Sequence, residues 1–590
     1  MRIVTFLRTS SRRRAAASAV VVAALLSTAA CGGANTSDGS GGGDAAGFNA
    51  GVGKVAQASD TKGGTLKFIG TQDADSWDPT VGYYGFAWNF MRFYTRQLIS
   101  YAPEPGEKGL ELKPDLAEDV AEVSDDGKTY TYHLKDDIKW QDGKPVTAMD
   151  VKYGIERQWA MDVLPGGPKY VKDTLDPKAK YKGPYKEDGG FDGIETPDEK
   201  TIVFHLPKAN SDFEQMLAMP SASAVREDKD TKSKYGLNPF SSGPYVFKNY
   251  EPNKNIELER NKYWEQSTDD IRAALPDKIS VDLITNDDEM DKRLINGDYD
   301  LHLSNTGLGA AGRATAMKEH KANVDNPIMG YIRYAVFSTD VKPLDNIHCR
   351  KALIYGADHK SLQTARGGPM AGGDIATNML PPVVPGSDEN YDPYGLRKKD
   401  GAPNAEMAKA ELKKCGKPNG FSTKIAVRNN VAVEVDTAES LQQSLSKVGI
   451  KAEIEQFDGS QTSAVVGNPA KVKKEGYGIS ILGWGPDFPT VQGYGKPLWH
   501  SSFIFDNGNY NFATIDDPKI DQAFADFIDT QDEAKKTEIA ESINHKVMEG
   551  AYYLPFTFEK ILVWRSDRTT NVYSTYAYSG QYDFVSIGVK

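Results

Sequence analysis

Three cysteines carry the most reactive side-chain chemistry in this chain, and the first lies where exported proteins are processed. Cys31 follows a basic segment and the apolar stretch Ala15–Leu26, which is too short to cross a bilayer, and small residues directly precede it. This order looks like a lipoprotein signal peptide over residues 1–30, with an acylated Cys31 as the first mature residue. An ordinary signal peptide ending in Ala-x-Ala is the alternative, and Arg12-Arg13 leaves a twin-arginine export route open.

The other two cysteines, Cys349 and Cys415, form an even number once Cys31 carries lipid, as expected in an exported chain. A bridge between them would close a loop of 66 residues and contribute about 4 kcal/mol on the chain-entropy account. We predict this disulfide. Two buried free thiols are the alternative.

The spacings that mark common catalytic and metal sites do not occur in this sequence. It contains no CxxC pair, no HExxH segment and no Gly-x-Ser-x-Gly nucleophile elbow. Acidic side chains are numerous, but surface carboxylates usually only interact with water. We therefore expect no metal, no cofactor and no enzymatic activity, and a secreted hydrolase is the least favoured class.

Composition indicates a large globular chain with an acidic surface. Its 590 residues are 39% hydrophobic and 26% charged, enough to bury more than one core. The formal charge is −12, and loss of the five arginines before Cys31 would lower it to −17. Because the mature chain has no basic cluster with interleaved aromatic residues, we expect no nucleic-acid partner.

Residues 31–63 have the composition of a flexible linker. They are rich in Gly, Ser, Ala, Asp and Asn and contain almost no aromatic side chains. Together with an acylated Cys31, this tether predicts a globular body held at the outer face of the cell membrane.

Beyond the tether, strand and helix signals alternate, most clearly over residues 422–457. Lys424–Val427 has a strand pattern, Asp436 and Glu439 predict the cap of a helix, and the residues after Gly449 alternate as a second strand. Such β-α-β units build sheets that helices cover, with ligand sites at the strand ends. We therefore expect an α/β fold.

The segment Pro114–Arg157 contains several local signals. Asp125–Gly127 predicts a turn, Lys128–Leu134 alternates as a half-buried strand, and Thr147 with Asp150 predicts a capping box at a helix start. The segment closely resembles the signature region of the bacterial family 5 extracellular solute-binding proteins, the dipeptide and oligopeptide receptors of ABC importers. Further segments resemble this family in the same order along the chain: Ser242–Trp264, Leu344–Leu353, Met407–Gly416 and Gly483–Pro489.

The resemblance implies a periplasmic-binding-protein-like α/β fold of type II, with two hinged lobes and an extra inserted domain. The implied first lobe comprises residues 64–108, 200–332 and 555–590, and the second lobe comprises residues 333–554. The extra domain takes residues 109–199. Lobes joined by crossing strands suit closure by a hinge around a ligand.

By the same resemblance, the chain captures extended peptides between its lobes. In oligopeptide receptors, the aspartate of the segment that resembles Gly483–Pro489 binds the ligand's ammonium group, and Asp487 occupies that position. A buried ammonium needs a carboxylate, because an unpaired buried charge costs several kcal/mol. A purely structural role for Asp487 in the turn before Pro489 is the alternative.

Further cleft residues follow from the same segment and from an aromatic run near the N-terminus, although large aromatic side chains often only pack in a core. The candidates are Gly483, Trp484, Tyr83 and Tyr84. Ile481 stands where some oligopeptide receptors carry an arginine, which removes one possible anchor for a peptide carboxylate. Pro486 replaces a small residue and stiffens the loop beside Asp487.

The resemblance also implies partners. We expect a peptide ligand, and the permease and ATPase subunits of an ABC importer, served by a monomer that its lipid holds at the membrane. A receptor of the same family for an oligosaccharide, a metal chelate such as nickel, or a signalling peptide is the alternative. Asp487 favours a ligand with an amine, the absence of a nearby histidine pair disfavours nickel, and the many aromatic residues leave sugar stacking open.

Overall fold

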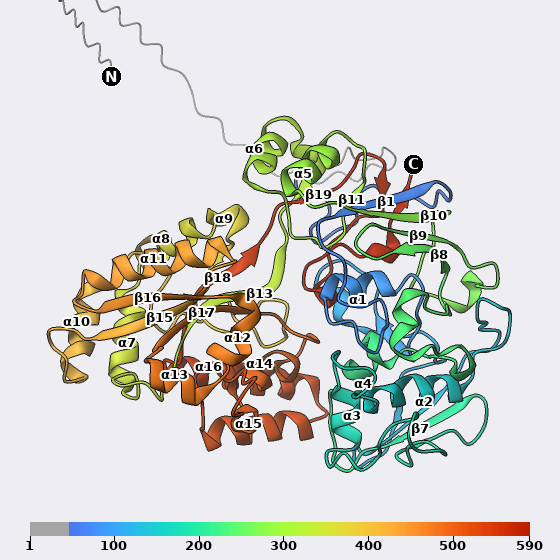
Figure 1. Cartoon of the computed structure of the whole chain (residues 1–590), viewed down its shortest axis with the longest axis horizontal. Helices are drawn as coiled ribbons and strands as arrows, with labels where there is room; N and C mark the ends of the chain where they lie inside the picture. Colours follow the sequence, from blue (N-terminus) through green and yellow to red (C-terminus); the bar gives the residue numbers. More distant parts are fainter. Residues whose placement is uncertain (1–46) are drawn as a thin grey trace, which may run out of the picture. The chain divides into compact units, whose positions relative to one another are not determined.

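The computed structural model describes residues 47–590, without the side chain of Lys399, and these residues form an α/β fold with two lobes (Figure 1). The predicted signal peptide, Cys31 and the first part of the predicted tether lie outside the described residues. Among residues 47–590, no helix is both long and apolar enough to span a membrane.

A five-stranded mixed sheet organises the first lobe. β1 is parallel to both of its neighbours, β10 and β11, whereas β9 is antiparallel to β10 and β8. Leu66 and Phe68 of β1 are fully buried, and Phe68 meets Phe584 of the C-terminal segment edge-on, with ring centroids 4.9 Å apart. In spatial order the strands are β11 (Leu301–His302), β1 (Thr65–Gly70), β10 (Lys278–Leu283), β9 (Asn255–Arg260) and β8 (Tyr245–Glu251).

A separate antiparallel sheet of four strands contains the local elements predicted for Pro114–Arg157. Its order is β4 (Glu122–Val123), β5 (Thr129–His133), β7 (Thr201–His205) and β6 (Ile194–Glu195). The predicted strand is β5, and the predicted capping box between Thr147 and Asp150 begins α2 (Ala148–Glu156). The implied domain boundaries stay predictions. The implied extra domain ends at residue 199, whereas β7, which pairs with β5 of the same sheet, begins at Thr201.

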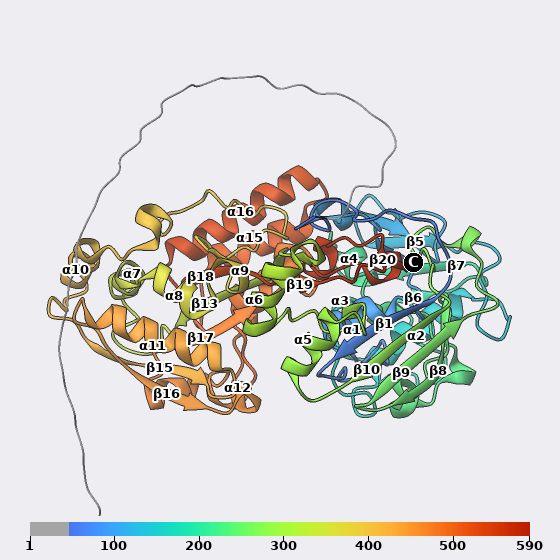
Figure 2. The ribbon, with the colours of Figure 1, turned by 90° about the horizontal axis from the view of Figure 1, so that it is seen from above.

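A six-stranded sheet forms the second lobe, with helices on both of its faces (Figures 1 and 2). β13 lies near its centre, antiparallel to both β17 and β18, while β15 is parallel to β16 and β17. The spatial order is β14 (Asp374–Ile375), β18 (Tyr553–Lys560), β13 (Ile328–Phe337), β17 (Ile479–Trp484), β15 (Ser422–Arg428) and β16 (Lys451–Phe457).

The predicted β-α-β unit is present as β15, α11 and β16, but the predicted start of its helix is wrong. α11 (Ala432–Ser446) begins four residues before Asp436, after Val431, which makes no side-chain cap. Glu434 in the first turn is buried and accepts a hydrogen bond from Arg428 Nε at 2.8 Å. An ion pair with the preceding strand, rather than a capping residue, thus accompanies the start of the helix.

Two chain crossings connect the lobes. β12 (Val324–Asp325) precedes β13, and β19 (Val563–Trp564) follows β18. These two short strands pair with each other, so the two crossings run side by side. Most buried apolar side chains belong to two large clusters, one for the first lobe with the four-stranded sheet and one for the second lobe, and a smaller cluster includes Val324 and Trp564 of the crossing strands.

The remaining elements surround these sheets. The other strands are β2 (Ile99–Tyr101), β3 (Leu112–Pro114), β20 (Thr569–Thr570) and β21 (Gly588–Val589). The helices on the side of the first lobe and the four-stranded sheet are α1 (Gly85–Met91), α3 (Tyr170–Leu175), α4 (Phe213–Leu217), α5 (Asp287–Ile295) and α6 (Ala310–Glu319). The second lobe carries α7 (Ile347–Gly356), α8 (His359–Ala365), α9 (Gly368–Ala371), α10 (Ala405–Lys414), α12 (Thr462–Val465), α13 (Pro469–Glu475), α14 (Val491–Trp499), α15 (Pro518–Asp529) and α16 (Glu533–Glu549).

The structure joins Cys349 and Cys415 in a disulfide with Cα atoms 5.2 Å apart. Cys349 lies within α7 and Cys415 directly follows α10, and these two helices pack against each other. The bridge therefore ties two neighbouring helices at the edge of the second lobe.

Replacing both cysteines, Cys349→Ser with Cys415→Ser, should destabilise the second lobe by about 4 kcal/mol, because the unfolded chain regains the entropy of a 66-residue loop. Denaturant unfolding of the purified protein measures this loss. The cysteines of the unreduced parent should resist alkylation; rapid alkylation of both would contradict the bridge.

Candidate ligand-binding site

Side chains from three separate parts of the chain meet at Asp487. Asp487 lies in the loop between β17 and α14, and its Oδ2 accepts hydrogen bonds from Tyr83 Oη at 2.7 Å and from Tyr170 Oη. Tyr83 precedes α1 in the first lobe, whereas Tyr170 begins α3 beside the four-stranded sheet. Among the described residues, no group donates a hydrogen bond to Asp487 Oδ1.

The loop that presents Tyr83 is held by Arg157, the last residue of the signature segment. The guanidinium of Arg157 binds Asp78 through two hydrogen bonds of 2.8 and 2.6 Å and donates a third to Thr80 Oγ1. The carbonyl of Asp78 in turn accepts from the N–H groups of Val81 and Gly82. This buried ion pair fixes the turn that leads into Tyr83, because a bidentate guanidinium–carboxylate contact sets orientation as well as distance.

The carboxyl group of Asp487 has no cationic partner among the described residues. No ion pair within residues 47–590 includes it, and the residue keeps only partial exposure while atoms of both lobes surround its carboxyl group. Burial raises the pKa of Asp487 to about 6, although the hydrogen bonds from Tyr170 and Tyr83 act in the opposite direction. An anion in this position is poised to gain a cation.

Aromatic rings line the cavity beside Asp487. Asp487 contributes the charged side chain of this lining, and the other side chains are apolar or neutral. Gly485 belongs to the same wall, and a Cβ there would lie 2.9 Å from the ring of Tyr331. The rings of the lining are Tyr83, Trp88, Tyr101, Tyr331 and Tyr578.

Trp484 lies next to this cavity without lining it. It ends β17, and its ring packs against Tyr510 with centroids 4.9 Å apart. The indole Nε1 is buried and has no hydrogen-bond partner among the described residues. Tyr510 is 40% exposed, so this ring pair adjoins open space on one side.

Gly483 leaves space for a neighbouring ion pair. The structure shows no contact between Gly483 and Asp487. It lies opposite Arg333 of β13, and a Cβ on Gly483 would lie 2.6 Å from the Arg333 side chain. Arg333 binds Glu559 through two hydrogen bonds of 2.9 and 2.8 Å. Ile481 is buried opposite Ala335, so this position belongs to the core of the sheet.

Tyr84 does not join Tyr83 at the site. Its ring stacks on Phe86 with an interplanar angle of 17°, and it lines a different pocket together with Asp73 and Asp75. Of the predicted cleft residues, the structure thus brings Asp487 and Tyr83 together, places Trp484 beside them, and leaves Gly483 and Tyr84 apart.

Sequence reasoning missed Tyr170, Tyr331 and Tyr578. Tyr170 lies in a segment without a clear periodicity, and its ring meets Phe488 edge-on at 5.2 Å. Tyr331 is 36% exposed and alternates in β13 with Ile332, so that it shares a strand face with the charged Arg333, a weak sequence signal that could have singled it out. Tyr578 carries no comparable signal.

Comparison with known proteins identifies the family. The family description "Bacterial extracellular solute-binding proteins, family 5 Middle" matches residues 111–506. The glutathione-binding protein GsiB of Escherichia coli O6:K15:H31 (strain 536 / UPEC) is 25% identical over 474 residues, which cover 79% of this chain and 84% of that protein.

Solved structures share the fold over nearly the whole chain. The clavulanic acid biosynthesis oligopeptide binding protein 2 is 37% identical with a TM-score of 0.89, covering 92% of this chain and 99% of that chain. The periplasmic binding protein DppA from Helicobacter pylori, in complex with the peptide STSA, is 21% identical with a TM-score of 0.69, covering 90% and 99%.

Replacing Asp487 with asparagine should stabilise the ligand-free protein at pH 7.5. Because the pKa of Asp487 is raised, ionisation of its carboxyl group opposes folding. The stability that this group contributes is fully present below the ordinary pKa of 3.8 and is lost as pH rises through about 6. We expect a gain on the order of 1–3 kcal/mol at pH 7.5 that shrinks toward pH 4.5.

Denaturant unfolding at the two pH values measures this difference. Asp516→Asn, at an exposed aspartate of the same lobe, is the control and should change little. A destabilised Asp487→Asn protein at pH 7.5 would contradict the assignment of an uncompensated carboxylate.

Proposed function

This chain belongs to the bacterial extracellular solute-binding proteins of family 5, and from that premise we propose that it captures peptides by their amino terminus for an ABC importer. The proposed cycle has three steps: the lobes separate, a peptide enters between them, and closure surrounds its ammonium group. The closed protein then presents the peptide to permease and ATPase subunits. No covalent step is involved.

The observation that carries this proposal is the free Oδ1 of a carboxylate that has no cationic partner among the described residues. A peptide ammonium offers three N–H donors and one positive charge. Asp487 Oδ1 can accept one donor, and the phenol oxygens of Tyr83 and Tyr170, which donate to Oδ2, keep lone pairs that can accept others. The ammonium would thereby link both lobes through one charge-assisted cluster.

The aromatic cavity supports a peptide rather than a bare amine. Its rings adjoin Asp487 directly, so a side chain next to the ammonium can bury apolar surface there. Arg333, whose guanidinium lies 5.4 Å from the ring centroid of Tyr331 in this wall, is already paired with Glu559. Recognition in this proposal therefore depends on the amino terminus more than on a carboxylate anchor.

Glutathione is a second candidate, because the relative GsiB is named as a glutathione-binding protein. Glutathione carries one ammonium and two carboxylates at neutral pH. The lining of the cavity beside Asp487 includes no lysine or arginine to balance those carboxylates. The absence of these cations from the lining favours neutral or cationic peptides over glutathione. The carboxylate of Asp487 favours an amine ligand over an oligosaccharide or a metal chelate.

The setting of this receptor is also a proposal. Residues 1–30 have the pattern of a lipoprotein signal and residues 31–63 that of a tether. We place the protein, as a monomer, at the outer face of the cell membrane with lipid on Cys31. There it can meet the permease without diffusing away.

Peptide binding tests the function. Isothermal calorimetry with trialanine and pentaalanine should show binding to the parent protein, and N-acetylation of either peptide should weaken it at least a hundredfold, because the charge pair with Asp487 is lost. Asp487→Asn should weaken the free-amine peptides by a similar factor. Asp516→Asn is the control. Equal affinity for free and acetylated peptides would exclude the assigned role of Asp487.

The proposed ammonium site also predicts how affinity depends on pH. Asp487 of the ligand-free protein becomes protonated as pH falls through about 6, so affinity for free-amine peptides should fall between pH 7.5 and pH 5. The same titration on Asp487→Asn should be flat over this range. An affinity of the parent protein that is constant across it would contradict the proposal.

A further inference from the structure

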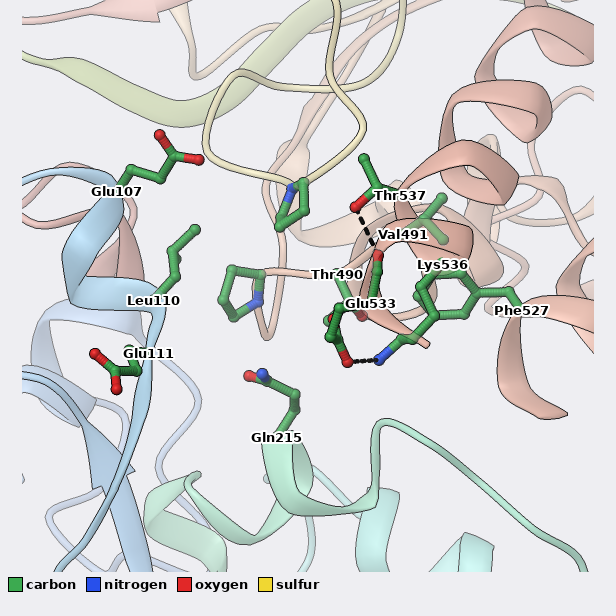
Figure 3. A pocket seen from close by; sticks show the side chains of 12 residues that line it. Glu107, Leu110, Glu111, Gln215, Thr490, Val491, Phe527, Glu533, Lys536 and Thr537 are labelled. Carbon is green, nitrogen blue, oxygen red and sulfur yellow. Dashed lines mark hydrogen bonds and ion pairs between the residues drawn. The ribbon is translucent and has the colours of Figure 1, made fainter. Parts of the chain in front are cut away.

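A second pocket lies at the contact between the lobes, and its lining includes Pro489 and Thr490 from the same loop as Asp487 (Figure 3). Glu107, Glu111 and Gln215 line it from the first-lobe side, and Thr490 and Lys536 line it from the second lobe. Asp212, the first-lobe residue directly before α4, binds both of these second-lobe side chains.

Each oxygen of the buried Asp212 carboxylate accepts a hydrogen bond from the second lobe. Its Oδ2 accepts from Thr490 Oγ1 at 2.6 Å, and its Oδ1 accepts from Lys536 Nζ at 3.0 Å. Asp212 is fully buried, and Thr490 and Lys536 are 8% and 6% exposed. The neighbouring Ser211 donates from its N–H to the Ile528 carbonyl at 2.9 Å, which adds a main-chain bond between the lobes.

A chain of hydrogen bonds connects this ion pair to the backbone of Asp487. Thr490 Oγ1, which donates to Asp212, accepts from the N–H of Gly493 at 3.1 Å. The carbonyl of Gly493 accepts from the N–H of Asp487 at 3.2 Å. Gly493 permits this close turn, since a Cβ there would lie 2.3 Å from the carbonyl oxygen of Phe488.

We propose that Asp212 is a positioning residue for ligand capture, which fixes the Asp487 loop through Thr490 and Gly493 when the two lobes are in contact. With the lobes apart, Thr490 loses its first-lobe acceptor, and Asp212 and Lys536 return to water. Lobe closure and the placement of the ammonium-binding carboxylate are then one event. The ligand-binding part of this proposal rests on the proposed function, whereas the lobe-contact part does not.

Lys536 makes this arrangement selective for one fit of the lobes. A buried ion pair returns roughly what its desolvation costs, but a lone buried charge is strongly unfavourable. The pair therefore adds little net attraction and instead penalises any closure that fails to bring Asp212 and Lys536 together. Lys536 also binds Glu533 at 3.2 Å, and that carboxylate is largely exposed (Figure 3).

Variants at Thr490 separate positioning from general packing. Thr490→Val keeps the shape but loses the hydroxyl, so binding of pentaalanine should weaken about ten- to a hundredfold, the worth of a hydrogen bond to a charged group. Thr490→Ser keeps the hydroxyl and should stay within about threefold of the parent. Glu533→Gln, which removes only the exposed partner of Lys536, is the control. Equal binding by the valine and serine variants would overturn the positioning role.

The lobe contact is tested by small-angle X-ray scattering with and without pentaalanine. Lys536→Met leaves Asp212 without its cation, so the radius of gyration should exceed that of the parent in both conditions, and the further change Asp212→Asn should reverse part of the increase. Identical radii for parent and Lys536→Met would overturn the proposal. The two proposals can fail separately. If the parent binds no free-amine peptide but the Lys536→Met variant has a larger radius of gyration than the parent, the proposed function is refuted and the proposed lobe contact is retained.

Discussion

A buried carboxylate is costly unless something balances its charge, and two aspartates at the contact between the lobes meet this constraint in different ways. Asp212 pairs with Lys536 and Thr490, and both of its oxygens are satisfied. Asp487, in the second-lobe loop between β17 and α14, accepts two phenol hydrogen bonds on one oxygen and none on the other from the described residues. The first arrangement stabilises one fit of the lobes, and the second leaves a negative site for a ligand to neutralise.

The signature segment of the family contributes to the site from a distance. Asp115 near its start accepts from both Arg96 and Arg272 at 2.7 Å in a fully buried network, which joins the N-terminal part of the first lobe to the segment around residue 270. Arg157 at its end holds Asp78 and thereby the turn before Tyr83. Its charged residues therefore shape the first-lobe wall that faces Asp487 without lining the cavity themselves.

The second lobe places its functional loop through strand register. β17 lies between β13 and β15, so Ile481 enters the core while Gly483 makes room for Arg333 and Glu559. The strand then ends at Trp484 and the chain turns toward the other lobe. A ligand site at the end of a strand, beside an interlobe contact, is where α/β folds commonly bind small molecules.

Local sequence patterns predicted what depends on neighbouring residues: a strand over Lys128–Leu134, observed as Thr129–His133, the capping box of Thr147 and Asp150, and the order of β15, α11 and β16. Resemblance to the family predicted the two-lobed α/β fold and pointed to Asp487. Only the tertiary structure decided that α11 begins at Ala432 and that Tyr83 rather than Tyr84 faces Asp487. It also brought Tyr170 to Asp487 from 317 residues away and Asp212 to Lys536 from 324. Such contacts depend on how the two lobes meet, and no periodicity within either segment encodes that geometry.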